Sequence, residues 1–343
     1  MIPSQISVIY SDVISQCNGD ISNLGTVVPI PCFTESILDE LCVIAINHLK
    51  VLPSLLLIDN DLVIVGDIYG NLHNLLHILM KFGFPPSTRY LFLGNYVDYG
   101  NYSLEVATLL LSLSCAYPDH VFLLKGESES FGLQVYQGFY QEVVSQFGNP
   151  QLWSKFINVF EYLPVATLIQ QSILCAQMGI LERYSSIGEI SVQMRPLRIP
   201  KLADAFTVAT SQMKNVFSED SANEIADKYN TGFIVSGSCP VGESIAGYAD
   251  GRIYAISACE SAAEITVLPI FIGHENDFSS FESIEACKRE DSKFSMKEVV
   301  TNARKKISIV IPKTISSSLL NKKITPQRFR KVSENKSMQM IVQ

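Results

Sequence analysis

LVIVGDIYGN, residues 62–71, decides the fold together with two later stretches of the same design, RYLFLGNYVDYG at residues 89–100 and HVFLLKGESE at residues 120–129. Each stretch begins with an apolar run typical of a buried strand and continues through a glycine into polar residues. A glycine at a strand exit lets the backbone turn sharply. Because ligands collect at the carboxyl ends of parallel strands, we expect the three loops to share one crevice.

The segments around these strands have the periodicity of helices. The predicted helices are a lead-in helix from residue 35 that ends before Pro53 and helices at 71–82, 103–115 and 131–147. Strand and helix in alternation indicate parallel βαβ units. After Leu163 the pattern changes to short β-rich pieces, at residues 165–174, 233–236, 251–257 and 264–272. These pieces predict a second sheet.

Length and composition exclude several classes of protein. The chain has 343 residues, of which 47% are apolar and 17% charged, so disorder throughout is excluded. The best apolar run, residues 106–117, is too short to cross a membrane, so we expect no spanning helix. No basic leader precedes an apolar block, and no cysteines form a CxxC pair. We therefore expect reduced thiols and a cytoplasmic location, with the nucleus as an alternative because of the basic tail.

The charge is distributed unevenly along the chain. Residues 281–343 carry 14 Lys and Arg against 6 Asp and Glu, whereas residues 1–280 carry 12 against 28. An acidic body argues against nucleic-acid binding by the globular part, because phosphate neutralisation needs clustered cations. The tail is either a solvated basic segment or a segment that docks on an acidic surface, including the protein's own body.

In order, spacing and flanks, the three loops resemble those of the phosphoprotein serine/threonine phosphatase family, within the calcineurin-like metallophosphoesterases, which read GDxHG, GDxVDRG and GNHE. The family's later HGG and RAH segments correspond to residues 176–179 and 236–238. The resemblance implies an α/β fold, a four-layer α/β/β/α sandwich of two mixed β-sheets flanked by helices. It divides the chain into an N-terminal extension (1–34), a phosphatase-like domain (35–272) and a basic, flexible C-terminal tail (273–343).

The resemblance also implies where two metal ions would be held, because six positions carry their ligands in the family. Only Asp67 is unchanged. The other five positions hold different residues: Tyr69, Gln177 and Ser238 replace histidines, Asn95 replaces the bridging aspartate and Glu127 replaces an asparagine. A neutral amide at position 95 cannot donate an anionic oxygen to two cations.

The positions that carry the family's chemistry are changed as well. The general-acid histidine is Ser128, whose hydroxyl cannot protonate a leaving alkoxide near neutral pH, although its orienting aspartate is kept as Asp98. The two phosphate-clamping arginines are Tyr99 and Ser236. A single general acid or transition-state contact raises the reaction rate by a factor of about 10² to 10⁴. With no catalytic residue intact, the sequence predicts a pseudophosphatase that acts by binding proteins, either phosphatase regulatory subunits or a structural assembly.

Two other functions stay open. Oxygen atoms of Asp67, Asn95, Glu127 and Gln177 would suit a single hard cation, Mg²⁺, Mn²⁺ or Ca²⁺, in a divergent phosphoesterase that hydrolyses phosphoserine or phosphothreonine. The chain could instead bind phosphate groups or phosphopeptides without hydrolysing them.

We favour a crevice that holds no cofactor and no metal ion. Its acidic side chains would then repel one another. Its predicted acids are Asp67, Asp98, Glu127 and Glu129. One of them would then carry a raised pKa, or Lys125 would move in as a counter-ion.

Overall fold

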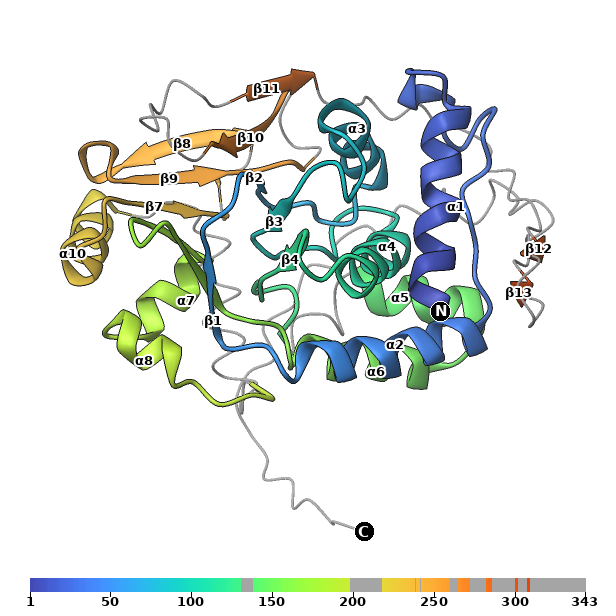
Figure 1. Cartoon of the computed structure of the whole chain (residues 1–343), viewed down its shortest axis with the longest axis horizontal. Helices are drawn as coiled ribbons and strands as arrows, with labels where there is room; N and C mark the ends of the chain where they lie inside the picture. Colours follow the sequence, from blue (N-terminus) through green and yellow to red (C-terminus); the bar gives the residue numbers. More distant parts are fainter. Residues whose placement is uncertain are drawn as a thin grey trace, which may run out of the picture.

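Two mixed β-sheets stack face to face, and helices cover both outer faces (Figure 1). The structure, a computed structural model, describes residues 1–130, 138–197, 218–237, 239–240, 242–259, 264–271, 282–285, 300–301 and 307–308. The six-stranded sheet has the order β1 (Leu55–Ile58), β5 (Ala166–Ile169), β6 (Ile173–Cys175), β7 (Phe233–Ser236), β9 (Ile253–Ile256), β8 (Ile245–Tyr248). The five-stranded sheet has the order β11 (Glu282–Glu285), β10 (Glu264–Ile270), β2 (Leu62–Val65), β3 (Tyr90–Phe92), β4 (Val121–Leu123). This arrangement confirms the predicted four-layer sandwich.

The alternation of side chains along each strand builds the layers. In β2, Leu62 and Ile64 point into the core between the two sheets, whereas Val63 and Val65 point into the core beneath the helices. Both faces of this strand are covered, which explains its uninterrupted apolar run. The parallel ladder from β2 through β3 to β4 places the three predicted loops at one edge of the five-stranded sheet.

The helices divide between the two outer faces (Figure 1). The five-stranded sheet is covered by helices from the first half of the chain: α1 (Ile2–Gln16), α2 (Glu35–Leu49), α3 (Leu72–Phe82), α4 (Ser103–Ala116), α5 (Gly138–Phe147) and α6 (Pro150–Phe160). The six-stranded sheet is covered by α7 (Met178–Arg183), α8 (Ile187–Ser191) and α10 (Glu219–Tyr229). In the described part of the chain, no helix is both long and apolar enough to cross a bilayer.

One of the predicted β-rich pieces contains two strands. Residues 165–174 form β5 and β6, which pair antiparallel through a tight turn at Gln170 and Gln171. Both residues have positive φ, 47° and 54°, a conformation usually signalled by glycine or asparagine. The sequence lacks that signal here and therefore does not predict the turn.

The N-terminal segment 1–34 contributes to the core. Helix α1 packs against α4 and buries Ile6 and Tyr10 completely. The division of the chain at residue 34 stays a prediction, but α1 shares one continuous apolar core with the helices of the predicted domain.

Parts of the predicted tail form strands. Strand β11 pairs antiparallel with β10, and Lys81 of α3 forms an ion pair of 3.3 Å with Glu282. A short hairpin, β12 (Val300–Thr301) with β13 (Ile307–Ser308), follows. The other residues of the predicted tail lie outside the described part of the chain.

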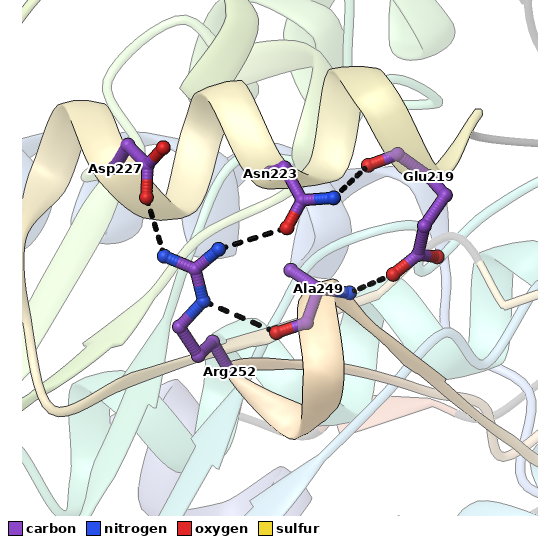
Figure 2. Close-up of polar contacts among 5 residues, drawn as sticks. All are labelled: Glu219, Asn223, Asp227, Ala249 and Arg252. Carbon is purple, nitrogen blue, oxygen red and sulfur yellow. Dashed lines mark hydrogen bonds and ion pairs between the residues drawn. The ribbon is translucent and has the colours of Figure 1, made fainter.

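A polar cluster ties α10 to the turn between β8 and β9 (Figure 2). The Arg252 guanidinium donates to Asp227 Oδ1 at 2.5 Å, to Asn223 Oδ1 at 2.8 Å and to the Ala249 carbonyl at 3.1 Å. Glu219 Oε1 accepts the Ala249 N–H at 2.6 Å. Because Ala249 has a φ of 54°, which favours glycine, these bonds hold the turn in a strained conformation.

Candidate functional site

The three predicted loops meet at the carboxyl edge of the five-stranded sheet. The N–H groups of Ile68 and Tyr69 donate to the Asn95 carbonyl at 3.1 and 2.8 Å, so the loops after β2 and β3 are joined directly. The third loop approaches as closely, since a Cβ atom added at Gly126 would lie 2.2 Å from the Asn95 nitrogen. Only glycine permits this contact.

Asp67 and Gln177 join the two sheets. Gln177 Nε2 donates to Asp67 Oδ1 at 2.7 Å and to the Leu93 carbonyl at 3.1 Å, and both side chains are buried. Since both partners are acceptors, the amide must present its N–H groups to them. A Cβ added at Gly237 would lie 2.1 Å from Asp67 Oδ1 and 2.2 Å from Gln177 Nε2, so any larger residue there would have to displace these two side chains.

Asn95 joins Tyr69 to the loop after β4. Its Nδ2 donates to the Tyr69 hydroxyl at 3.0 Å, and its Oδ1 accepts the Ser128 N–H at 3.0 Å. The backbone N–H of Ser128 can only donate, so it settles which end of the amide carries the oxygen. Burial, with added repulsion from Asp67 and Glu127, raises the pKa of Tyr69 well above its usual value. Tyr69 is therefore a neutral phenol.

Tyr99 and Glu127 lie at the more open side of the site. Tyr99 is 61% exposed, and its ring stands edge-to-face to Tyr69, with centroids 4.9 Å apart and planes at 82°. Glu127 is half-buried, and its Oε1 packs over Gly179 of α7, where an added Cβ would lie only 2.3 Å away.

Asp98 and Ser236 are both buried. Asp98 Oδ1 accepts the Phe139 N–H at 3.0 Å, whereas its Oδ2 has no hydrogen-bond partner among the described residues. Burial raises the pKa of Asp98 to about 6. The Ser236 hydroxyl also has no hydrogen-bond partner among those residues. Ser238 lies outside the described part of the chain.

Glu129 does not join the crevice acids, contrary to our expectation. Its carboxylate lies beneath the loops and accepts three backbone N–H groups at 2.8 to 2.9 Å, those of Asn95, Tyr96 and Gly126. Lys125 is fully buried and its Nζ donates to the carbonyls of Glu129 and Phe160 at 2.8 and 3.0 Å. Burial raises the pKa of Glu129 and lowers that of Lys125. The pair supports the loops instead of lining the site.

Glu142 of α5 is a supporting residue that the sequence analysis missed. Its carboxylate accepts the Ser103 hydroxyl at 2.8 Å and the Leu104 N–H at 3.2 Å, at the start of α4. Ser103 Oγ in turn accepts the Asp98 N–H at 3.1 Å. Nothing in the sequence around residue 142 marks this role, because its partners are nearly 40 residues away.

The described side chains of the site lack the donor set that a metal ion requires. In the part of the chain that the structure describes, no group of three or more His, Cys, Asp or Glu side chains could hold a metal ion. The amides at positions 95 and 177 direct N–H groups at Tyr69 and Asp67, and an N–H group cannot act as a ligand. These orientations do not fit a dinuclear metal centre.

Known proteins resemble this chain in sequence and fold. Residues 61–237, more than half of the chain, match the family described as calcineurin-like phosphoesterase. The serine/threonine-protein phosphatase 4 catalytic subunit of Kluyveromyces lactis is 36% identical over 166 residues, which is 48% of this chain and 54% of that protein. A protein of Schizosaccharomyces pombe named as a serine/threonine-protein phosphatase gives the same identity and coverage.

A solved structure of a serine/threonine phosphatase from Saccharomyces cerevisiae, with similarity to human phosphatase PP5, superposes with a TM-score of 0.64. It is 20% identical and covers 75% of this chain and 92% of that chain, a likeness that shows the fold alone. The chain spans about half the length of the curated relatives it matches, 54% in each case. The matched residues include every described position of the site, and the chain belongs to the calcineurin-like phosphoesterase family.

Proposed function

We propose that this protein is a pseudophosphatase, which keeps the fold of the serine/threonine phosphatases and acts by binding other proteins. The relation to that family rests on the matched residues and the relatives. The inactivity and the binding role are inferred from the chemistry of the site.

The observation that carries the proposal is the hydrogen bond from Gln177 to Asp67 at 2.7 Å. Asp67 is the one side chain that matches the family's ligand set, and an amide N–H occupies its Oδ1. A cation at this oxygen would have to displace the N–H group and turn the Gln177 amide away from the Leu93 carbonyl as well. Leaving a buried polar group unsatisfied costs about 1 to 3 kcal/mol.

The phosphate-binding positions support the same conclusion. Tyr99 and Ser236 stand where the resemblance places two arginines, and neither offers a positive charge to a phosphate. Glu127 adds a carboxyl group at the ligand position normally held by a neutral asparagine. A phosphate dianion would be repelled by ionised carboxylates on this side of the site.

A protein-binding role follows from what the fold retains. The two sheets and their helices are held together by three clusters of buried apolar residues, and none of these clusters consists of the site's polar side chains. Such a fold can compete for a phosphatase's regulatory subunits or serve as a structural component.

Hydrolysis of para-nitrophenyl phosphate by the purified full chain tests the proposal, with Mn²⁺ or Mg²⁺ added and bound metal measured by mass spectrometry. We expect a rate of hydrolysis no higher than in buffer without protein, and no bound transition metal. Turnover that Asp67→Ala abolishes would overturn the proposal and establish the alternative, a phosphoesterase using one hard cation. Asp12→Ala, on the outer side of α1, is the matched carboxylate control.

A variant that regains the family's ligands tests whether the replaced side chains are the reason why the site does not bind metal. The combined substitutions Tyr69→His, Asn95→Asp, Glu127→Asn and Gln177→His restore four of the family's ligand types. We expect this variant, unlike the wild type, to be stabilised by Mn²⁺ in thermal unfolding. Equal Mn²⁺ stabilisation of the wild type would contradict the proposal.

A further inference from the structure

The turn that follows α1 carries an asparagine before a glycine, at residues 18 and 19, and the sequence holds no other such pair. Both residues are exposed and both are left-handed, with φ of 52° and 82°. Left-handed central residues are typical of Asn-Gly in a tight turn. The turn is closed by the Asp20 N–H, which donates to the Cys17 carbonyl at 3.0 Å. Asn18 and Gly19 therefore stand side by side in solvent at the end of α1.

Two groups in this turn are available to react with each other. Among the described residues, neither the Asn18 carboxamide nor the Gly19 backbone N–H has a hydrogen-bond partner. A Cβ added at Gly19 would meet no atom within 4 Å, so no neighbouring segment crowds the turn. Glycine also has no side chain that would hinder an approach to its own nitrogen.

We infer that Asn18 is the site of an intramolecular deamidation. The Gly19 nitrogen attacks Asn18 Cγ, and the new N–C bond closes a succinimide ring. The bond between Cγ and Nδ2 breaks, and ammonia leaves with the proton of the Gly19 N–H. Water then opens the ring at either carbonyl and leaves aspartate or isoaspartate at residue 18. The only co-reactant is water, and the inference is independent of the proposed function.

The reaction changes the charge and the length of the turn. Both products place a carboxylate directly after α1, where the partial charge of the helix dipole is already negative. Hydrogen bonds from Ser22 lower the pKa of nearby Asp20, so this carboxyl group is negative as well. Isoaspartate also adds a methylene group to the main chain, inside the turn that the bond between Asp20 and Cys17 closes.

This turn helps to fix the position of α1. The Cys17 carbonyl also accepts Asn23 Nδ2 at 3.2 Å, and the Leu24 carbonyl lies 3.2 Å from Nε2 of His73 in α3. Helix α1 itself packs against α4. A longer, more negative turn would weaken the bonds to the Cys17 carbonyl, so the modified chain should hold α1 less tightly and unfold at a lower temperature.

Peptide mapping by mass spectrometry tests the inference on the full chain, incubated in its folded state. Asn230 is the matched control, since it is exposed, has a φ of 46° and ends α10, but precedes Thr231. We expect Asn18 to convert about tenfold faster than Asn230, because Gly19 lacks the β-branched side chain that hinders the nitrogen of Thr231. Equal conversion of the two asparagines would overturn the inference.

A methyltransferase specific for isoaspartate, supplied with labelled S-adenosylmethionine, identifies the product. We expect it to methylate the incubated wild-type chain and to leave most of that signal absent from Asn18→Gln. Gly19→Ala, which adds a single methyl group in open space, should also lose most of the signal. Methylation of both variants to the wild-type level would place the reaction elsewhere and overturn the inference.

Anion exchange separates the modified chain, which carries an additional negative charge, from the unmodified chain. The modified chain should unfold at a lower temperature, and equal unfolding temperatures would overturn the link to α1. Hydrolysis of para-nitrophenyl phosphate would contradict the proposed function alone, so the two failures are distinguishable.

Discussion

Gln177 Nε2 lies 2.7 Å from Asp67 Oδ1, and this hydrogen bond connects residues 110 positions apart in the chain. Asp67 follows β2 of one sheet, and Gln177 follows β6 of the other. The bond therefore joins the carboxyl edges of the two sheets through side chains, and it uses the acceptor that a metal ion would require.

We expect Gln177→Leu to lower the free energy of unfolding by about 1 to 3 kcal/mol, because it leaves the buried Asp67 carboxylate without this donor. Urea unfolding followed by circular dichroism measures the change. In an Asp67→Ala background the same substitution should have a smaller effect, since the acceptor is gone. Equal effects in the two backgrounds would mean that the bond contributes nothing.

Gly237→Ala should destabilise the protein by about 1 to 3 kcal/mol, because the added Cβ would lie 2.1 Å from Asp67 Oδ1 and 2.2 Å from Gln177 Nε2. Gly188→Ala in α8 is the matched control, since its nearest neighbour would be 3.7 Å away. A helical alanine is favoured over glycine, so the control should unfold at the same or a higher temperature. Similar losses in both variants would contradict the prediction.

Stability should fall as the pH rises from about 5 to 8, because buried carboxyl groups surround the start of α4. Burial raises the pKa of Glu142 to about 8, with repulsion from Glu105 adding, and raises that of Glu105 to about 7. Burial also raises the pKa of Asp98, to about 6. These values exceed those of the unfolded chain, so the native state binds more protons and loses stability as they dissociate.

The expected slope is roughly 1 kcal/mol per pH unit for each group between its unfolded and folded pKa. Glu142→Gln keeps hydrogen-bonding groups near Ser103 and Leu104 and cannot ionise, so it should flatten the dependence between pH 6 and 8. Burial also raises the pKa of the neighbouring Tyr10 and Cys32, so these groups stay neutral over this range. Urea unfolding at a series of pH values gives the slope, and an unchanged slope in the variant would remove Glu142 as its source.

Ile6→Ala should cost about 2 to 4 kcal/mol of unfolding free energy, because Ile6 is fully buried where α1 packs against α4. Val8→Ala, at a position that is 55% exposed on the same helix, should cost less than about 1 kcal/mol. The comparison tests whether the segment 1–34 belongs to the folded core. Equal, small effects would show that it is dispensable.

Much of the fold was predictable because local patterns and global packing agree. The apolar run of β2 is covered on both faces, and an uninterrupted apolar run is typical of a strand that is buried in this way. Helices α3 and α4 lie within a residue of their predicted bounds, and strands β2, β3 and β4 form from the apolar runs that begin the three decisive stretches. The turn at Gln170 and Gln171 was missed because no glycine marks its positive φ.

The order of amino acids is enough to say which functional groups stand at each position of the site, including an amide at 95 and an aromatic ring at 99. The directions in which those groups point follow from the folded chain alone. Gln177 meets Asp67, and Glu129 turns beneath the loops to bind backbone N–H groups. Such choices depend on which donors and acceptors are left unpaired when distant segments pack together, and no local pattern in the chain encodes them.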